Sequence, residues 1–242
     1  SRAKDLFKIK IKSIFIPAFV LAAITQIIGI YLNTMISVSP DGTQVTSLVG
    51  IILLIFAMIV IRCLISGIIM VILYDSVITP DLTKVLSYVT RLLPSLILNY
   101  VIFMILVGIG LMLYIIPGLI LLTFFALYEQ IILFEQEKGI GSLTQSFGRI
   151  RHLFFATFTI VVFCLVVRYI PIYLLQSLGE QLSSAPLFGI DQAIEIFINT
   201  ITIAFISSVY VTLYDEIKNR QKINTKNLSK SKNKSKTRSK KT

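Results

Sequence analysis

Six continuous apolar segments, each long enough to cross a bilayer as a helix, dominate this sequence. About 20 apolar helical residues span the ~30 Å hydrocarbon core of a membrane. The segments are continuous rather than alternating, and a helix satisfies its own backbone hydrogen bonds in lipid, so we predict helices rather than strands. They occupy residues 13–36, 47–74, 94–114, 117–136, 153–176 and 187–213.

The composition agrees with a membrane protein. Hydrophobic residues make up 55% of the 242 residues and charged residues only 14%, which is too apolar for an ordinary soluble domain. The first segment exceeds the roughly 7 to 15 residues of a signal-peptide core, so we expect it to be retained. Cys63 and Cys164 lie within apolar segments and indicate no disulfide framework. The predicted fold class is all-α, a polytopic membrane bundle of six transmembrane helices.

The basic residues predict the orientation, because short loops rich in Lys and Arg stay cytoplasmic. Of the 23 Lys and Arg residues, 21 lie before the first segment, in the second and fourth loops, or after the last segment. The other three loops, around 37–46, 115–116 and 177–186, contain none. We therefore predict that both termini are cytoplasmic.

Two cytoplasmic loops share an amphipathic pattern. Residues 82–93 and 143–154 match in apolar spacing, 61 positions apart, and each pattern predicts a short helix in the membrane interface. Thr79, Pro80 and Asp81 supply a helix start before the first of them. Either the chain contains two similarly oriented units or two short amphipathic stretches are alike by chance.

Charged residues inside the predicted spans are the strongest functional signal, because an unpaired arginine at a helix centre costs at least ~2.5 kcal/mol. Arg62 and Glu129 lie about 22 and 18 Å from the outer face, and Arg168 and Glu195 about 12 and 13 Å. Asp191 belongs to the same polar stripe as Glu195. Similar depths predict two charge pairs, which either fix helix partners or form a substrate or proton route.

Signatures of catalysis are missing from the sequence. It has one histidine, His152, and no H-E-x-x-H, C-x-x-C or G-x-S-x-G pattern. We therefore predict that the chain is not an enzyme and uses no cofactor or metal.

The predicted membrane domain covers residues 1–215, and residues 216–242 form a polybasic tail. Alternating basic and small polar residues cannot build a core, so we expect the tail to be disordered. At a cytoplasmic surface it should bind anionic lipid headgroups at ~1 kcal/mol per basic residue. Nucleic acid is not expected, because no interleaved aromatics are present to stack bases. Compositional drift is the alternative explanation of the tail. The predicted lipid-facing basic surface contains Arg149, Arg151, Lys230, Lys232, Lys234 and Lys236.

One part of the chain resembles a known family. The segments are Tyr114-Ile-Ile-Pro-Gly-Leu-Ile, then Ile131-Ile-Leu-Phe-Glu-Gln-Glu-Lys-Gly139, then Ser142-Leu-Thr-Gln-Ser-Phe-Gly-Arg-Ile-Arg151. Over about 114–154 they resemble the YciC family of bacterial inner-membrane proteins, with a weaker echo in Leu213-Tyr-Asp-Glu-Ile-Lys218. The resemblance implies a bacterial cytoplasmic membrane protein with no established enzyme activity.

A similar motif occurs in noncatalytic membrane domains attached to glycerophosphodiester phosphodiesterases, which implies a scaffolding or lipid-facing role. The chain departs from the family pattern at Glu129 and Gln130, where that pattern has an Ala-Pro step. The leading hypothesis is a nonenzymatic protein of envelope maintenance or a membrane scaffold, whose protein partner the sequence does not identify. The alternative is a small-solute or lipid transporter that uses the intramembrane charges.

Overall fold

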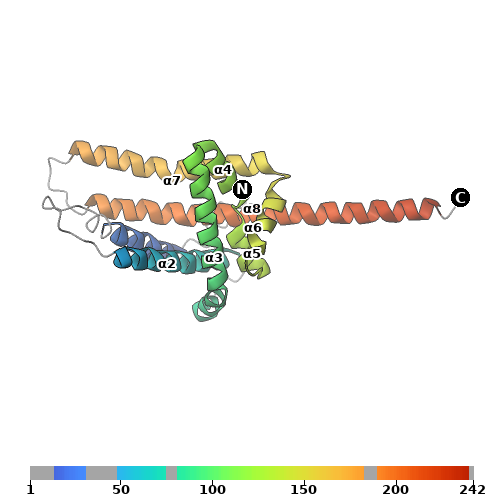
Figure 1. Cartoon of the computed structure of the whole chain (residues 1–242), viewed down its shortest axis with the longest axis horizontal. Helices are drawn as coiled ribbons and strands as arrows, with labels where there is room; N and C mark the ends of the chain where they lie inside the picture. The colour runs from blue at the N-terminus through green and yellow to red at the C-terminus, as the bar shows by residue number, and fades with distance from the viewer. Residues whose placement is uncertain (1–13, 31–47, 75–80, 183–189, 240–242) are drawn as a thin grey trace.

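The computed structural model describes residues 14–30, 48–74, 81–182 and 190–239 (Figure 1). Within these ranges the side chains of residues 48–49, 172, 175–176, 178–182, 190–192 and 222–239 are not described. This part of the chain contains helices joined by short turns and no strand, which confirms the all-α fold class. After a first helix, Ile14–Ile30, come α2 (Leu48–Tyr74), α3 (Leu82–Leu113), α4 (Ile115–Phe124), α5 (Tyr128–Glu135), α6 (Gly141–Ile150), α7 (Phe154–Leu182) and α8 (Ile190–Ser239).

Five stretches among the described residues are long and apolar enough to cross a membrane, and the first helix is a shorter apolar one. The five stretches and the first helix together correspond to the six segments that the sequence predicts, so the chain is a membrane protein. The five stretches are Gly50–Tyr74, Leu82–Leu113, Ile115–Glu135, Phe154–Pro171 and Ala193–Gln221.

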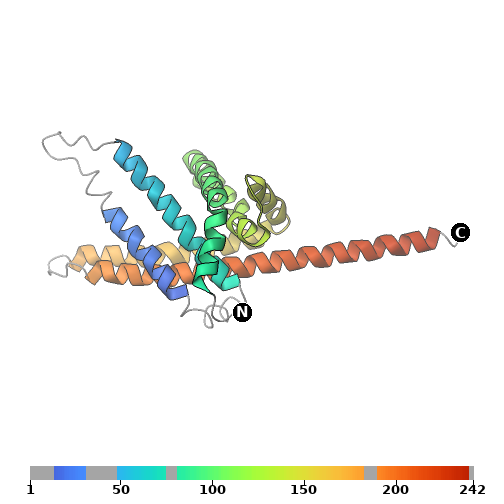
Figure 2. The same cartoon turned by 90° about the horizontal axis from the view of Figure 1, so that it is seen from below.

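The first predicted interfacial helix is not a separate element, because α3 continues from it into the next apolar segment. Asp81 is the N-cap of α3, and its carboxylate accepts a hydrogen bond from the Thr83 amide at 3.1 Å. Pro94 lies inside the helix, and α3 bends in the views of Figures 1 and 2. A proline that lacks an N–H and crowds the preceding turn explains a kink at this position.

A tight corner at Tyr114 folds α4 back against α3. Tyr114 is in an extended conformation between the two helices. A Cβ on Gly110 would lie 2.9 Å from Gly118 Cα, and one on Gly118 would lie 2.4 Å from Leu111 Cδ2. The two glycines therefore let the helix backbones approach closely. In Figure 1, α3 runs across the direction of α7 and α8.

The predicted span 117–136 is divided into α4 and α5 by a turn at residues 125–127. Ser146 of α6 forms hydrogen bonds with backbone groups at this turn. Its hydroxyl donates to the Phe124 carbonyl at 2.8 Å and accepts from the Leu127 amide at 3.2 Å. Past α5, Gln136 and Gly139 have positive φ angles of 55° and 70°, and the chain turns into α6.

The main core forms where α2, α3 and α5 meet. Ile69, Val89 and Ile132, one from each helix, have no exposed surface. A Cβ on Gly67 would lie 2.8 Å from Val89 Cγ1, so α2 packs closely on α3.

The last helix runs well beyond the other helices (Figures 1 and 2). Residues 190–239 contain neither Gly nor Pro, so no stop signal ends α8 after its apolar part. The sequence predicts a disordered tail from residue 216, whereas the backbone stays helical to Ser239. Ile217 is only 2% exposed, so the packed domain also reaches beyond the predicted boundary at residue 215.

Candidate functional site

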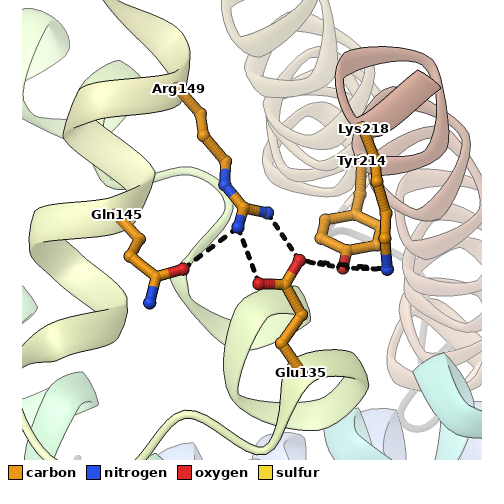
Figure 3. Close-up of polar contacts among 5 residues, drawn as sticks. All are labelled: Glu135, Gln145, Arg149, Tyr214 and Lys218. Carbon is orange, nitrogen blue, oxygen red and sulfur yellow. Dashed lines mark hydrogen bonds and ion pairs between the residues drawn. The ribbon is translucent and has the colours of Figure 1, made fainter. Parts of the chain in front are cut away.

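Glu135, the last residue of α5, binds side chains from two other helices (Figure 3). Its Oε1 and Oε2 accept from the two terminal nitrogens of Arg149 in α6, at 2.7 and 2.6 Å. Oε1 also accepts from the Tyr214 hydroxyl in α8 at 2.5 Å and lies 3.9 Å from Lys218 Nζ. Gln145 Oε1 accepts from Arg149 at 3.0 Å. We call these five residues the Glu135 clamp.

Local structure positions each member of the clamp. Glu135 and Arg149 come together because Gln136 and Gly139 reverse the chain between α5 and α6. Tyr214 is 1% exposed, with its ring against Phe134 at 5.1 Å between centroids.

Lys218 is one helical turn after Tyr214, and its Nζ donates to the Tyr214 hydroxyl at 3.0 Å. The clamp therefore joins α5 and α6 to α8 where its basic part begins; we call this part, residues 218–239, the α8 extension.

The contacts of the clamp occupy most of the hydrogen-bonding capacity of Glu135. A carboxylate offers about four lone-pair positions, and Glu135 uses three for hydrogen bonds and faces a second cation. Hydrogen bonding to Glu135 raises the pKa of the Arg149 guanidinium above its usual value, which favours its charged form. Bidentate Arg–carboxylate pairs are strong and directional. The arrangement can hold three helices in a fixed geometry.

The clamp corrects one prediction and adds residues that the sequence did not identify as a site. Arg149, predicted to face lipid, is 16% exposed in its side chain and is bound to Glu135. Glu135, Gln145, Tyr214 and Lys218 all lie within segments that carry the family resemblance. Their position in these segments is the one sequence signal that could have identified them as a site. The sequence does not show that the segments meet in space.

A buried polar contact fixes the start of α6. Asn99, fully buried in α3, donates from Nδ2 to the Gly139 carbonyl at 2.8 Å, and Ser142 donates to Asn99 Oδ1 at 2.9 Å. Together with Ser146, this contact packs the amphipathic helix α6 against the bundle. The side of α6 that carries Ser142 and Ser146 is buried, which the prediction of an interfacial helix does not include.

Arg62 and Glu129 come close enough to interact electrostatically, but the structure shows no ion pair between them. The Arg62 guanidinium lies 4.3 Å from the centre of the Tyr100 ring. Glu129 accepts from Ser66 at 3.1 Å and from Tyr128 at 2.9 Å. Within the described residues, Arg62 has no hydrogen-bond acceptor. The predicted neighbours are therefore brought together, with different direct partners.

The second predicted pair is not formed in the structure. Glu195 accepts from Gln26 of the first helix at 2.9 Å, while Arg168 is exposed and lies 5.9 Å from the Tyr169 ring centre. Similar depth did not suffice, because Glu195 has its partner on the first helix, whereas Arg168 lies near the ring of the adjacent residue of α7. Asp191 lies on α8, outside the described side chains.

The other residues of the predicted lipid-facing basic surface are Arg151 and four lysines of α8. Arg151 is exposed and donates to His152 Nε2 at 3.2 Å. The backbone of α8 carries the tail lysines, but their side chains are not among those described. They are Lys230, Lys232, Lys234 and Lys236.

Among the described residues, no group of three His, Cys, Asp or Glu side chains is placed to hold a metal ion. Comparisons with models of protein families, with curated proteins and with solved structures find no match. The resemblance to the YciC family therefore rests on sequence motifs alone and stays a prediction.

Proposed function

We propose that this chain is a nonenzymatic scaffold of the bacterial inner membrane, with a role in envelope maintenance and both termini in the cytoplasm. The Glu135 clamp is the observation that carries the proposal. It uses the polar side chains at this end of the bundle to join helices to one another, rather than presenting them to a substrate. The asymmetry of Lys and Arg between alternate loops supports the orientation.

The α8 extension gives the scaffold a surface for partners. Eleven basic residues lie between Lys218 and Lys241, and the clamp fixes the helix at the start of this stretch. Anionic lipid headgroups are the proposed partners of Arg151 and of the basic residues nearest the bundle. A membrane-protein partner would contact α8 at the same place, near Lys218.

Transport is the second candidate function, and the intramembrane cluster around Arg62 favours it. Arg62 has no acceptor among the described residues, and the buried Gln130 Oε1 has no hydrogen-bond partner there. Intramembrane ionisable groups without saturated partners are typical of substrate or ion routes.

Complementation distinguishes the two functions. In a strain that lacks the gene, the scaffold account predicts that Arg62→Gln restores envelope integrity, measured as detergent resistance, while Glu135→Gln does not. The opposite pattern would favour transport and contradict the scaffold. Each variant's abundance in the membrane is measured in parallel, and Glu216→Gln is the matched control, because that carboxylate is exposed on α8 and pairs only locally with Arg220.

A further inference from the structure

The hairpin formed by residues 94–124, from Pro94 through α4, differs in direction from its neighbours. Figure 1 shows α7 and α8 along the long axis of the molecule and α3 across it, and in Figure 2 α7 and α8 keep that direction. If α7 and α8 cross the bilayer, the hairpin lies close to the membrane plane.

The length of the hairpin's second arm supports this reading. α4 has ten residues, about 15 Å at 1.5 Å per residue, which is half of the ~30 Å hydrocarbon core. The chain then breaks at residues 125–127, where Ser146 holds the turn. From Tyr114 to Glu135 the apolar stretch is therefore not one straight helix.

The tip of the hairpin requires an apolar environment. Met112 is 90% exposed, and Tyr114 and Ile115 are 80% and 70% exposed. No charged residue occurs between Arg91 and Glu129. An uncharged tip with its large side chains uncovered by protein matches acyl chains far better than water.

The hairpin is anchored at the end of the bundle from which the basic part of α8 leaves (Figure 1). Asn99 ties its first arm to Gly139 and Ser142, just after α5 and its clamp residue Glu135. Because the basic segments predict that this end is cytoplasmic, the leaflet beside the hairpin is the cytoplasmic one.

We propose that the hairpin inserts into the cytoplasmic leaflet, parallel to the membrane plane, with acyl chains of that leaflet around Tyr114. The sequence instead predicts residues 115–116 as a loop on the opposite face. Both arrangements return the chain to the same side, so the distribution of Lys and Arg does not distinguish them. The proposal rests on the proposed orientation but not on the scaffold function.

Thiol accessibility tests the position of the tip. In a chain with Cys63→Ala and Cys164→Ala, Tyr114→Cys is treated with a membrane-impermeant maleimide in intact and then permeabilised cells. We expect no labelling in either state and full labelling after denaturation. Asp41→Cys, in a predicted outer loop, and Lys84→Cys, on the cytoplasmic side, are the controls. Labelling of Tyr114→Cys in intact cells, at the rate of Asp41→Cys, would overturn the proposal.

A depth measurement covers the case in which a second copy of the chain shields the tip. Nitroxides are attached at Ile105 and Met112, both exposed on α3. The collision rates of each nitroxide with lipid-soluble oxygen and with a water-soluble relaxing agent give its depth in the bilayer. A hairpin in the plane gives equal depths and free access to oxygen. A crossing helix gives depths about 10 Å apart over seven residues, and a covered tip excludes oxygen; either result contradicts the proposal.

Discussion

Arg149 binds Glu135 through both terminal nitrogens, although the two residues lie on different helices and 14 positions apart in the sequence. The Tyr214 hydroxyl reaches the same carboxylate from 79 positions away. A single acidic side chain thus connects α5, α6 and α8. Ser146 makes a contact of the same kind, because its side chain in α6 bonds to backbone groups at the junction of α4 and α5.

Arg149→Lys keeps the positive charge but loses the two-nitrogen contact with Glu135. We expect it to lower the free energy of unfolding by about 1–3 kcal/mol, because a lysine cannot replace a bidentate guanidinium. Thermal unfolding in detergent measures the effect. Arg151→Lys, two positions away and exposed, should change stability by less than about 0.5 kcal/mol. Equal effects of both variants would contradict the role given to Arg149.

Ser146→Ala should destabilise the junction between α4 and α5. The substitution leaves the Leu127 amide without its hydrogen-bond acceptor in a buried position, which costs about 1–3 kcal/mol. Denaturant titration of the purified protein measures this loss. Ser87→Ala, at an exposed position of α3, serves as the control, and a stability of Ser146→Ala equal to that control would show that the turn does not depend on Ser146.

Gly110→Ala and Gly108→Ala should have opposite effects, although both lie in α3. A Cβ at Gly110 meets the Gly118 backbone at 2.9 Å, whereas a Cβ at Gly108 meets nothing within 4 Å. We expect the first to lower the unfolding temperature through overpacking. The second should leave it unchanged or raise it, because alanine favours helix by up to about 1 kcal/mol. A neutral Gly110→Ala would mean that the hairpin arms do not approach as described.

Arg62 and Tyr100 should be energetically coupled. The guanidinium lies over the Tyr100 ring, and a cation–π contact away from water contributes about 0.5–2 kcal/mol. A double-mutant cycle with Arg62→Gln and Tyr100→Leu measures the coupling directly. Additive single effects would show that the contact contributes nothing, and would leave the neighbouring Glu129 as the dominant partner of Arg62.

The apolar segments and the amphipathic stretch at α6 were predictable because hydrophobic periodicity and length determine them locally. The contact partners of the polar side chains could not be predicted in this way. Glu195 meets Gln26 instead of Arg168, since depth along a helix says nothing about which faces point at each other. Arg149 has a basic side chain suited to lipid headgroups, but a nearby carboxylate at the end of α5 binds it instead.

Breaks in helices were predicted less well than helices themselves. The stop at residues 125–127 has no Gly or Pro, because Ser146 from another helix supplies the hydrogen bonds that allow it. The sequence predicts a span that starts at Pro94, whereas α3 continues through this residue with a bend. Such features depend on tertiary contacts that a local pattern does not contain.

Hydrogen exchange at the base of α8 tests most directly the claim that the Glu135 clamp fastens this helix to the bundle. Glu135→Gln removes the charge that holds Arg149 and Lys218, so amides from Leu213 to Lys218 should exchange at least about tenfold faster, equivalent to roughly 1.4 kcal/mol of local stability. Glu216→Gln should leave them unchanged. Identical protection in the wild type and in Glu135→Gln would contradict the account.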